Sequence, residues 1–472
     1  MTKRVITVSP MPPEKSAYAL ARYSRSADSI RQSIDWVRSH NSQSFLESFY
    51  FQYGHQSIAD LGHTVVCFEG VSELAASEIE DETLWDGQAK SSRYQDFSKS
   101  GFITPPELEG ESAELYRTAG ESLLRAYKEV HLRVNDYLTD KLPRPESMKP
   151  DAYSRNIAAR AFDVARYLLF WGVPTNVGQV TSIRTLEKQI KRMRASEFAE
   201  VRELGQELAE ACAAPPDCMW DPRNNEPLAP TLARHAEPDQ YARQAREDLR
   251  LWAAQNLTVG AVEVKHDVEL IKPDDVLSEI VATLLYPVCE HPFRAIYETA
   301  RAWSKAQKAE VLDVAVKSRG SRDDLLREFR GGQYCFDMLI DIGAYRDMHR
   351  HRRCHQYRQA YRCHGYPEPA PLAEAGAEGI YNAAMRNALM TMEKLPEPAR
   401  QYLLPFGARS RFLFKMDFAE VEYMSRVRSG VKGHFSYRDI AWQMKQRVEE
   451  IEPELAKLID TTPPWIEDPL KR

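Results

Sequence analysis

Long apolar runs are missing from this 472-residue sequence. No stretch approaches the roughly 18 consecutive apolar residues of a membrane span. The first ten residues also lack the long apolar segment of an export signal. We therefore expect a cytoplasmic protein that makes no contact with a membrane.

Cysteine is scarce, with seven residues at irregular spacing. An odd, scattered set predicts reduced thiols rather than a disulfide framework. In the C-terminal half of the chain, Cys354, His355, Cys363 and His364 lie close together in the sequence. His351 precedes His355 by about one helical turn. Their spacing matches no standard zinc motif. No metal site is predicted, and zinc binding stays open as an alternative.

Positive charge is not in excess overall, because the formal net charge is −6. Hydrophobic residues make up 43% and charged residues 28%, which is ordinary for a globular protein. The mild acidity argues against nucleic acid as a partner, although a local cationic patch can still bind anions. Non-catalytic binding of RNA or another polyanion remains a second alternative.

One such patch stands out. Arginine and histidine make up more than half of residues 345–358. The mostly apolar run 333–340 precedes them and has the length of a strand. Residues 344–358 contain neither Gly nor Pro, so we expect a helix there. A cationic helix that follows a buried strand is placed to hold a polyanion, because arginine offers planar paired donors to phosphate.

The rest of the chain predicts mixed secondary structure. A β-like run covers 64–68, and Ser72 is expected to cap an acidic helix that continues to Thr83. A proline-rich stretch within 213–230 predicts a linker. A short strand is expected at 262–265. Helices are expected at 15–50, 110–140, 155–215, 238–256, 274–286, 376–394, 397–404 and 416–430.

An internal repeat emerges when the two halves are compared. Arg166 and Arg194 are separated by the same interval as Arg400 and Arg428, in similar local sequences. The strand, helix and loop that end at Ser91–Tyr94 correspond in order to those that end at Ala360–Cys363. We predict two diverged copies of one domain, residues 1–222 and 231–472, joined by a linker at 223–230.

These residues resemble the flavin-dependent thymidylate synthases. The signature of that family is a strand, a helix that ends in Arg-Gln-x-x-Arg-His-Arg, and a loop that ends in Ser-x-Arg-Tyr. The resemblance implies an α+β fold, with a small sheet flanked by long helices in each copy. It also implies FAD as cofactor, with NADPH and methylene-tetrahydrofolate as co-substrates, for methylation of dUMP at C5.

The signature is split between the copies. The second copy keeps Arg346 and Arg350–Arg352, whereas Asp347 replaces the family Gln and the following loop has lost its pattern apart from Arg362. The first copy has Asp81–Thr83 where Arg-His-Arg belongs, but Ser91–Tyr94 matches the nucleotide loop.

By resemblance, two groups of residues form one composite site between the copies. The cofactor-binding residues are Arg350, His351, Arg352, His55, Ser57 and His434. The substrate-binding residues are Ser91, Ser92, Arg93, Arg166, Arg194, Arg428 and Arg346. Reduced flavin supplies the hydride, so no protein nucleophile is expected.

Family members work as tetramers with sites built between subunits, so a fused pair of copies implies a homodimer that imitates the tetramer. Asp81 and Glu82 would repel a flavin pyrophosphate in the opposite pairing of copies. We therefore expect them to form ion pairs with the arginine-rich segment. The departures from the signature leave one functional alternative, a flavin- or polyanion-binding paralogue without thymidylate synthase activity.

Overall fold

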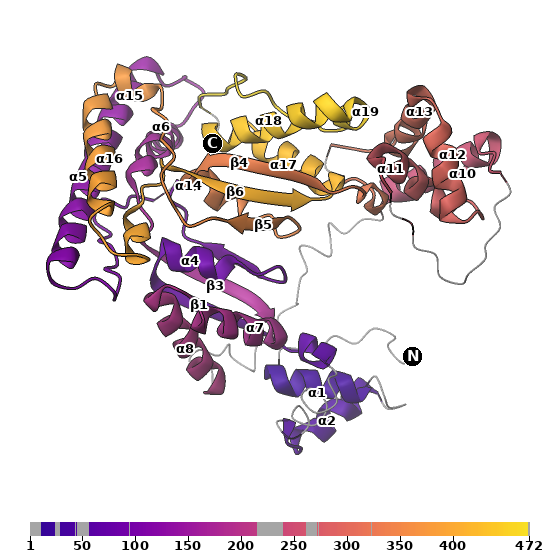
Figure 1. The fold of residues 1–472 in the computed structure, drawn as a ribbon, viewed down its shortest axis with the longest axis horizontal. Coiled ribbons are helices and arrows are strands. Elements are labelled where there is room, and N and C mark those ends of the chain that lie inside the picture. The colour runs from indigo at the N-terminus through magenta and orange to yellow at the C-terminus, as the bar shows by residue number, and fades with distance from the viewer. Residues whose placement is uncertain are drawn as a thin grey trace. The chain divides into compact units, whose positions relative to one another are not determined.

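The structure is a computed structural model, and the chain forms two compact units (Figure 1). Unit 1 consists of residues 1–217, 341–352 and 360–410, and unit 2 of residues 218–340, 353–359 and 411–472. The residues described are 11–23, 29–42, 44, 56–93, 95–214, 239–260, 271, 273–321 and 323–470. Within these ranges, no helix has the length and apolarity needed to cross a bilayer.

The predicted linker at 223–230 and the strand expected at 262–265 lie outside the described residues. The repeat boundaries at 222 and 231 stay a prediction, because a compact unit is not the same thing as a sequence copy. Unit 1 illustrates the difference, since it contains segments from both halves of the chain.

The sheet of unit 1 has three antiparallel strands in the order β1-β3-β2. They are β1 (His63–Ser72), β2 (Asp86–Ala89) and β3 (Pro174–Ser182). A register shift interrupts β1 between Phe68 and Val71, where Gly70 has a φ of 64°. Residues that carry a side chain rarely adopt a positive φ, which explains why glycine occupies this bulge.

Unit 1 also contains helices of very different length, of which α4 (Glu73–Glu80) and α7 (Ile183–Arg194) pack on the sheet. Its other helices in the described ranges are α1 (Pro13–Tyr23), α2 (Ile30–Arg38), α5 (Gly110–Lys141), α6 (Pro150–Ala165), α8 (Ala199–Ala213), α14 (Ile342–Met348), α15 (Pro371–Glu374) and α16 (Glu378–Met392), with 3-10 turns η2 (Gln56–Leu61), η3 (Arg166–Leu168) and η6 (Ala399–Leu403). Helices α5 and α16, from opposite halves of the sequence, lie side by side (Figure 1). Tyr137 of α5 also donates a 2.5 Å hydrogen bond to Glu374.

Unit 2 contains a second three-stranded sheet in the order β4-β6-β5. Its strands are β4 (Tyr334–Asp341), β5 (His355–Arg358) and β6 (Arg409–Met416), and the end residues 341, 409 and 410 belong to unit 1. Its helices are α10 (Gln240–Asn256), α11 (Val276–Leu285), α12 (Phe293–Ala302), α13 (Lys305–Val316), α17 (Phe418–Ser429), α18 (Phe435–Ile451) and α19 (Pro453–Ala456), with 3-10 turns η4 (Tyr286–Val288) and η5 (Arg327–Phe329).

The two halves of the sequence build the same strand-to-helix junctions. Ser72 ends β1 and caps α4 by accepting from the Ala75 N–H at 3.0 Å, and Asp341 does the same for α14 with Ala344 at 2.8 Å. Ser182 caps α7, and Asp417 caps α17. A short oxygen-bearing side chain at each junction satisfies an N–H that the first helical turn leaves unpaired.

The copies also exchange backbone hydrogen bonds symmetrically within unit 1. Phe170 and Pro405 form an isolated antiparallel bridge. Equivalent residues around it donate in both directions: Trp171 N to Leu404 O, Phe406 N to Leu169 O, Gly172 N to Tyr402 O and Gly407 N to Tyr167 O. Such reciprocal pairs arise when two similar segments meet about a twofold axis, as the tandem-copy interpretation requires.

The α+β class is confirmed, but three expectations about local structure were wrong. The segment 155–215 is not one helical region, because β3 interrupts it with alternating buried and exposed side chains. The helix after β4 ends at Met348, so Arg350–Arg352 lie in the turn before β5. The acidic helix α4 ends at Glu80, which leaves Asp81 and Glu82 beyond it.

Candidate functional site

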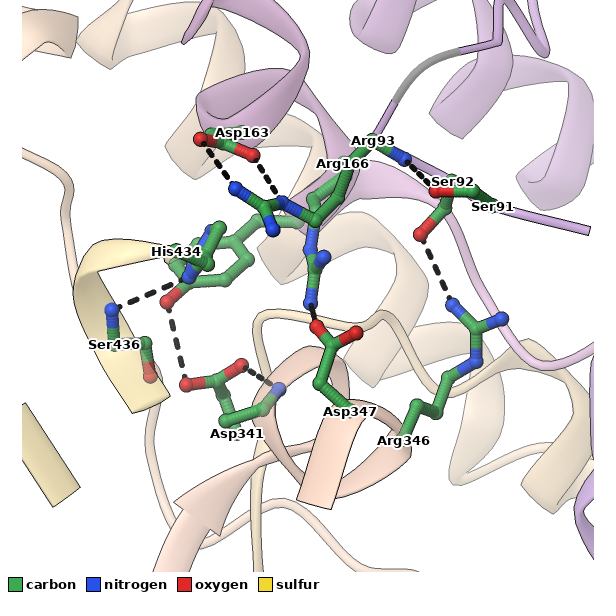
Figure 2. Close-up of polar contacts among 12 residues, drawn as sticks. Ser91, Ser92, Arg93, Asp163, Arg166, Asp341, Arg346, Asp347, His434 and Ser436 are labelled. Atoms are coloured by element: carbon green, nitrogen blue, oxygen red, sulfur yellow. Dashed lines mark hydrogen bonds and ion pairs between the residues drawn. The ribbon is translucent and has the colours of Figure 1, made fainter. Parts of the chain in front are cut away.

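Helix α14 brings Arg346 onto the nucleotide-loop motif of the first copy. Its guanidinium donates to Ser92 Oγ at 3.0 Å and forms a 2.5 Å ion pair with Glu73 of α4 (Figure 2 shows the Ser92 contact). The same guanidinium lies over the Phe406 ring, 4.7 Å from its centroid. A residue from the second half of the sequence therefore contacts a loop from the first half, as the composite-site prediction requires.

Two further arginines of the predicted site hold buried ion pairs (Figure 2). Arg93 Nε lies 2.8 Å from Asp163, whose side chain is 2% exposed. Arg166, also almost fully buried, lies 3.0 Å from Asp347. Burial opposes the charged form of Arg166, but the nearby carboxylates outweigh it and its pKa is raised. The negative charge of Asp347 is therefore balanced inside the protein.

Glu73 is the buried acid of this cluster. Its side chain is 2% exposed, and its Oε1 atom has no hydrogen-bond partner in the part of the chain that the structure describes. Burial raises the pKa of Glu73 to about 7, against the opposing charge of Arg346. The carboxyl group therefore changes charge near neutral pH.

The Arg-His-Arg turn lies next to the cluster within unit 1. Arg350 is exposed, whereas His351 is buried. The Arg352 guanidinium stacks 4.6 Å from the Trp85 ring centroid and lies 3.5 Å from Asp86. Its Nε is buried and makes no hydrogen bond among the described residues. A buried donor in a cationic turn fits an anionic group of a cofactor such as a flavin phosphate.

The opposite pairing of copies is present too, with different chemistry. Ser77 of α4 stands where α14 has Arg346, and it lies 3.5 Å from Tyr361, which stands where the other loop has Ser92. The Tyr361 ring packs on Trp171, with centroids 4.9 Å apart. An arginine–serine contact in one pairing is thus a serine–tyrosine contact in the other. Within unit 1, the first pairing alone carries the cation.

Other predicted site residues have more varied positions. Ser91 Oγ accepts the backbone N–H of Arg93 at 3.3 Å. Arg194 is exposed at the end of α7 in unit 1. In unit 2, Arg428 lies over the Tyr437 ring, and His434 caps α18 by accepting from Ser436 N–H at 3.2 Å.

The side chains of the remaining two predicted residues, His55 and Ser57, are not described by the structure. His55 lies outside the described residues. Ser57 belongs to η2, and the structure does not describe its side chain.

The expected ion pairs of the acidic stretch were assigned to the wrong residues. Glu82 pairs with Arg192 of α7 at 2.9 Å, whereas within unit 1 the arginine-rich segment meets Glu73 and Asp86. Sequence reasoning missed Glu73, Asp163 and Trp85. The repeat held one signal, because Glu73 stands where the second copy has Ile342, and a carboxylate replacing an apolar residue at a buried position needs a partner.

The zinc alternative finds no ligand set. Across the described ranges, which include all five candidate residues, no group of three or more His, Cys, Asp or Glu side chains is arranged to hold a metal ion. Burial also raises the pKa of the Cys354 thiol to about 12.

Comparison with known families gives the class of this protein. The family model for thymidylate synthase complementing protein matches residues 5–215 and again 283–454. The chain belongs to this family, the flavin-dependent thymidylate synthases, and the two matched regions agree with a tandem, two-copy member. Membership implies a flavin cofactor and a nucleotide substrate.

Relatives of similar length are found in bacteria and archaea. A UPF0159 protein of Chlamydia muridarum is 26% identical over 85% of this chain and 77% of its own length. A UPF0159 protein of Chlamydia pneumoniae is also 26% identical, over 87% of this chain and 78% of its own. One from Thermoplasma acidophilum is 23% identical over 94% of both chains.

Proposed function

We propose that this protein uses FAD, NADPH and methylene-tetrahydrofolate to methylate a uridine nucleotide, dUMP, at C5. The observation that carries the proposal is the contact between Arg346 and Ser92. It joins the two parts of the family signature that the copies have divided between them. Only this pairing of copies, within the described part of unit 1, has a cation at that position.

Each part of unit 1 has a role that its surroundings favour. Arg350 and Arg352 would hold flavin phosphates, because Arg350 is exposed and the buried Nε of Arg352 has no hydrogen-bond acceptor among the described residues. Ser91, Ser92 and Arg346 would bind the nucleotide phosphate. Arg93 and Arg166 would shape the loop and the helix end, since their charges are balanced by buried carboxylates.

The remaining roles rest on family membership. His351, His434, His55 and Ser57 would line the flavin pocket, and Arg194 or Arg428 would contact the pyrimidine. When bound, the reduced flavin supplies hydride, so the protein contributes orientation and electrostatics rather than a nucleophile. A cytoplasmic homodimer that imitates the tetramer of the family is part of the proposal.

A second candidate is a flavin- or polyanion-binding paralogue without synthase activity. The ion pairs of Arg93, Arg166 and Arg346 favour it, because a cation that is already paired has less attraction left for a phosphate.

Absorbance between about 350 and 500 nm, the range of flavin chromophores, decides between the two candidates when FAD and dUMP are added in turn. The synthase predicts a flavin spectrum that shifts on addition of dUMP, followed by dTMP formation once both co-substrates are present. Flavin binding without a dUMP response supports the paralogue. Absence of flavin binding by the wild type would contradict the synthase and the flavin-binding paralogue, and would leave polyanion binding.

A variant at the Ser92 contact tests the composite site itself. Ser92→Ala removes the acceptor of Arg346 but leaves the buried Arg93–Asp163 pair in place, so the dUMP response should weaken while FAD still binds. Ser98→Ala is the matched control, because the backbone N–H and the hydroxyl of Ser98 both donate to Asp96. Equal loss of the dUMP response in both variants would sink the composite-site assignment.

A further inference from the structure

We infer that Glu73 is a proton-exchanging counter-ion of the composite site, which takes up a proton when an organic phosphate binds to Arg346. This inference rests on the proposed function for the ligand class, and it adds a residue and a linkage that the family signature does not contain. The inference is based on the geometry of Glu73. This buried acid pairs with Arg346, the cation to which a phosphate would bind, and its second oxygen has no hydrogen-bond partner among the described residues.

The pair is asymmetric. One carboxylate oxygen of Glu73 is bonded to Arg346, and the other is buried and unpaired among the described residues. A buried carboxylate with one free oxygen is poorly solvated, so it depends strongly on its single cation. A phosphate that draws the Arg346 guanidinium away leaves Glu73 buried without its ion-pair partner. The proton comes from solvent and joins a carboxylate oxygen, which becomes a neutral acid.

The charges around Glu73 also favour proton uptake by its carboxylate when a phosphate binds. Arg346 and Arg350 face Glu73 from α14 and the turn after it, and Glu80 faces it from its own helix. From α8, Glu200 accepts from the Ser72 N–H and hydroxyl beside it, and the Arg192 side chain of α7 is paired with Glu82. The two arginines stabilise the carboxylate, and an incoming phosphate weakens that stabilisation. The pKa of Glu73, already raised to about 7, should rise further on binding.

The linkage has a consequence for affinity. Where binding takes up a proton, affinity falls as the pH rises. Phosphate affinity should therefore decline through neutral pH and above in the wild type, apart from the change expected from ionisation of the phosphate itself. Glu73→Gln removes the proton acceptor but keeps the shape of the side chain. Its affinity should depend on pH only through the ligand.

The first experiment needs no ligand. An infrared pH titration of the full chain should show a carboxyl group that changes protonation near pH 7, a signal that is absent from Glu73→Gln and present in the control Glu80→Gln. If wild type and Glu73→Gln give the same titration near neutrality, the inference is overturned whatever the protein does as an enzyme.

The second experiment measures the linkage. Calorimetry with dUMP in buffers of different ionisation enthalpy gives the number of protons taken up, which should be positive for the wild type and Glu80→Gln and close to zero for Glu73→Gln. Equal uptake by wild type and Glu73→Gln contradicts the inference. If dUMP does not bind, pyrophosphate replaces it as the probe. Proton uptake with pyrophosphate then supports the counter-ion role while the synthase proposal fails, and binding without uptake rejects the counter-ion role.

Discussion

Phe170 and Pro405 occupy equivalent positions in the two copies and pair with each other in an antiparallel bridge. The Phe170 side chain is completely buried, and Pro405 is buried as well. A contact between a residue and its own counterpart marks the place where two copies meet face to face. The crossing of α14 onto the first loop and of α4 onto the second follows from this arrangement, because a twofold relation creates every such contact twice.

Gly172, beside this bridge, tests how tightly the first copy packs at this place. A Cβ atom at Gly172 would lie 2.0 Å from the Tyr116 hydroxyl oxygen, and that buried tyrosine donates to Ile103 O. Gly172→Ala should therefore cost about 1–3 kcal/mol, the usual range for overpacking. The loss would appear as a lower melting temperature.

The control for this prediction is Gly178→Ala in β3. A Cβ there would have its nearest neighbour at 3.8 Å, an ordinary contact, so its melting temperature should stay close to that of the wild type. Equal stability of the two variants would show that the close packing of Gly172 against Tyr116 is wrong.

The pair Arg93–Asp163 has a natural comparison in the other copy. Arg93→Ala removes the cation that pairs with the buried Asp163, and breaking such a buried pair typically costs about 3–5 kcal/mol. Arg362, the counterpart of Arg93, pairs with Glu397 at 3.5 Å, but its side chain is 60% exposed. Arg362→Ala should cost less than about 1 kcal/mol.

Denaturant unfolding at constant pH and salt measures both changes. Double variants with Asp163→Ala and Glu397→Ala then isolate the coupling energy of each pair. A coupling at Arg362 as large as that at Arg93 would contradict the difference in burial on which the prediction rests.

The limits of sequence reasoning show in the same residues. The repeat was visible because Arg166, Arg194, Arg400 and Arg428 keep their spacing, and the cap at Ser72 was visible because serine before a helix has a local signature. The partners of the arginines were not visible. Whether Arg166 meets a phosphate or Asp347 depends on a contact between distant segments, which no local pattern encodes. The turn at Arg350–Arg352 was missed because a sequence without Gly or Pro permits a helix but does not require one.

Arg350 provides the most direct test of the flavin site. It is exposed, so Arg350→Ala should change the free energy of unfolding by no more than about 0.5 kcal/mol, as for most surface substitutions. Loss of a charge-assisted bond to a phosphate should weaken FAD binding by roughly 10-fold. Fluorescence titration with FAD measures the affinity.

Arg353→Ala is the matched control for Arg350. Arg353 lies three positions further along the chain and pairs with Asp417 in unit 2 at 3.3 Å. Its loss should leave FAD affinity within about 2-fold of the wild type, since a solvent-exposed pair contributes little. Similar weakening in both variants would indicate general electrostatic attraction rather than a site at the Arg-His-Arg turn.

Glu73 links stability to pH. Its pKa is raised on folding, so the native state binds more protons than the unfolded state between about pH 4.5 and about 7. Stability should therefore fall as the pH rises across that window, because the free energy of unfolding decreases with pH wherever the unfolded chain holds fewer protons than the native state. Glu73→Gln removes this contribution, so the difference in melting temperature between variant and wild type should shift in favour of the variant from pH 5 to pH 8. Glu80→Gln removes a negative charge that raises the pKa of Glu73, so it should keep the decline of stability with pH but move it to lower pH. Parallel profiles for wild type and Glu73→Gln would show that the buried acid does not titrate in this range.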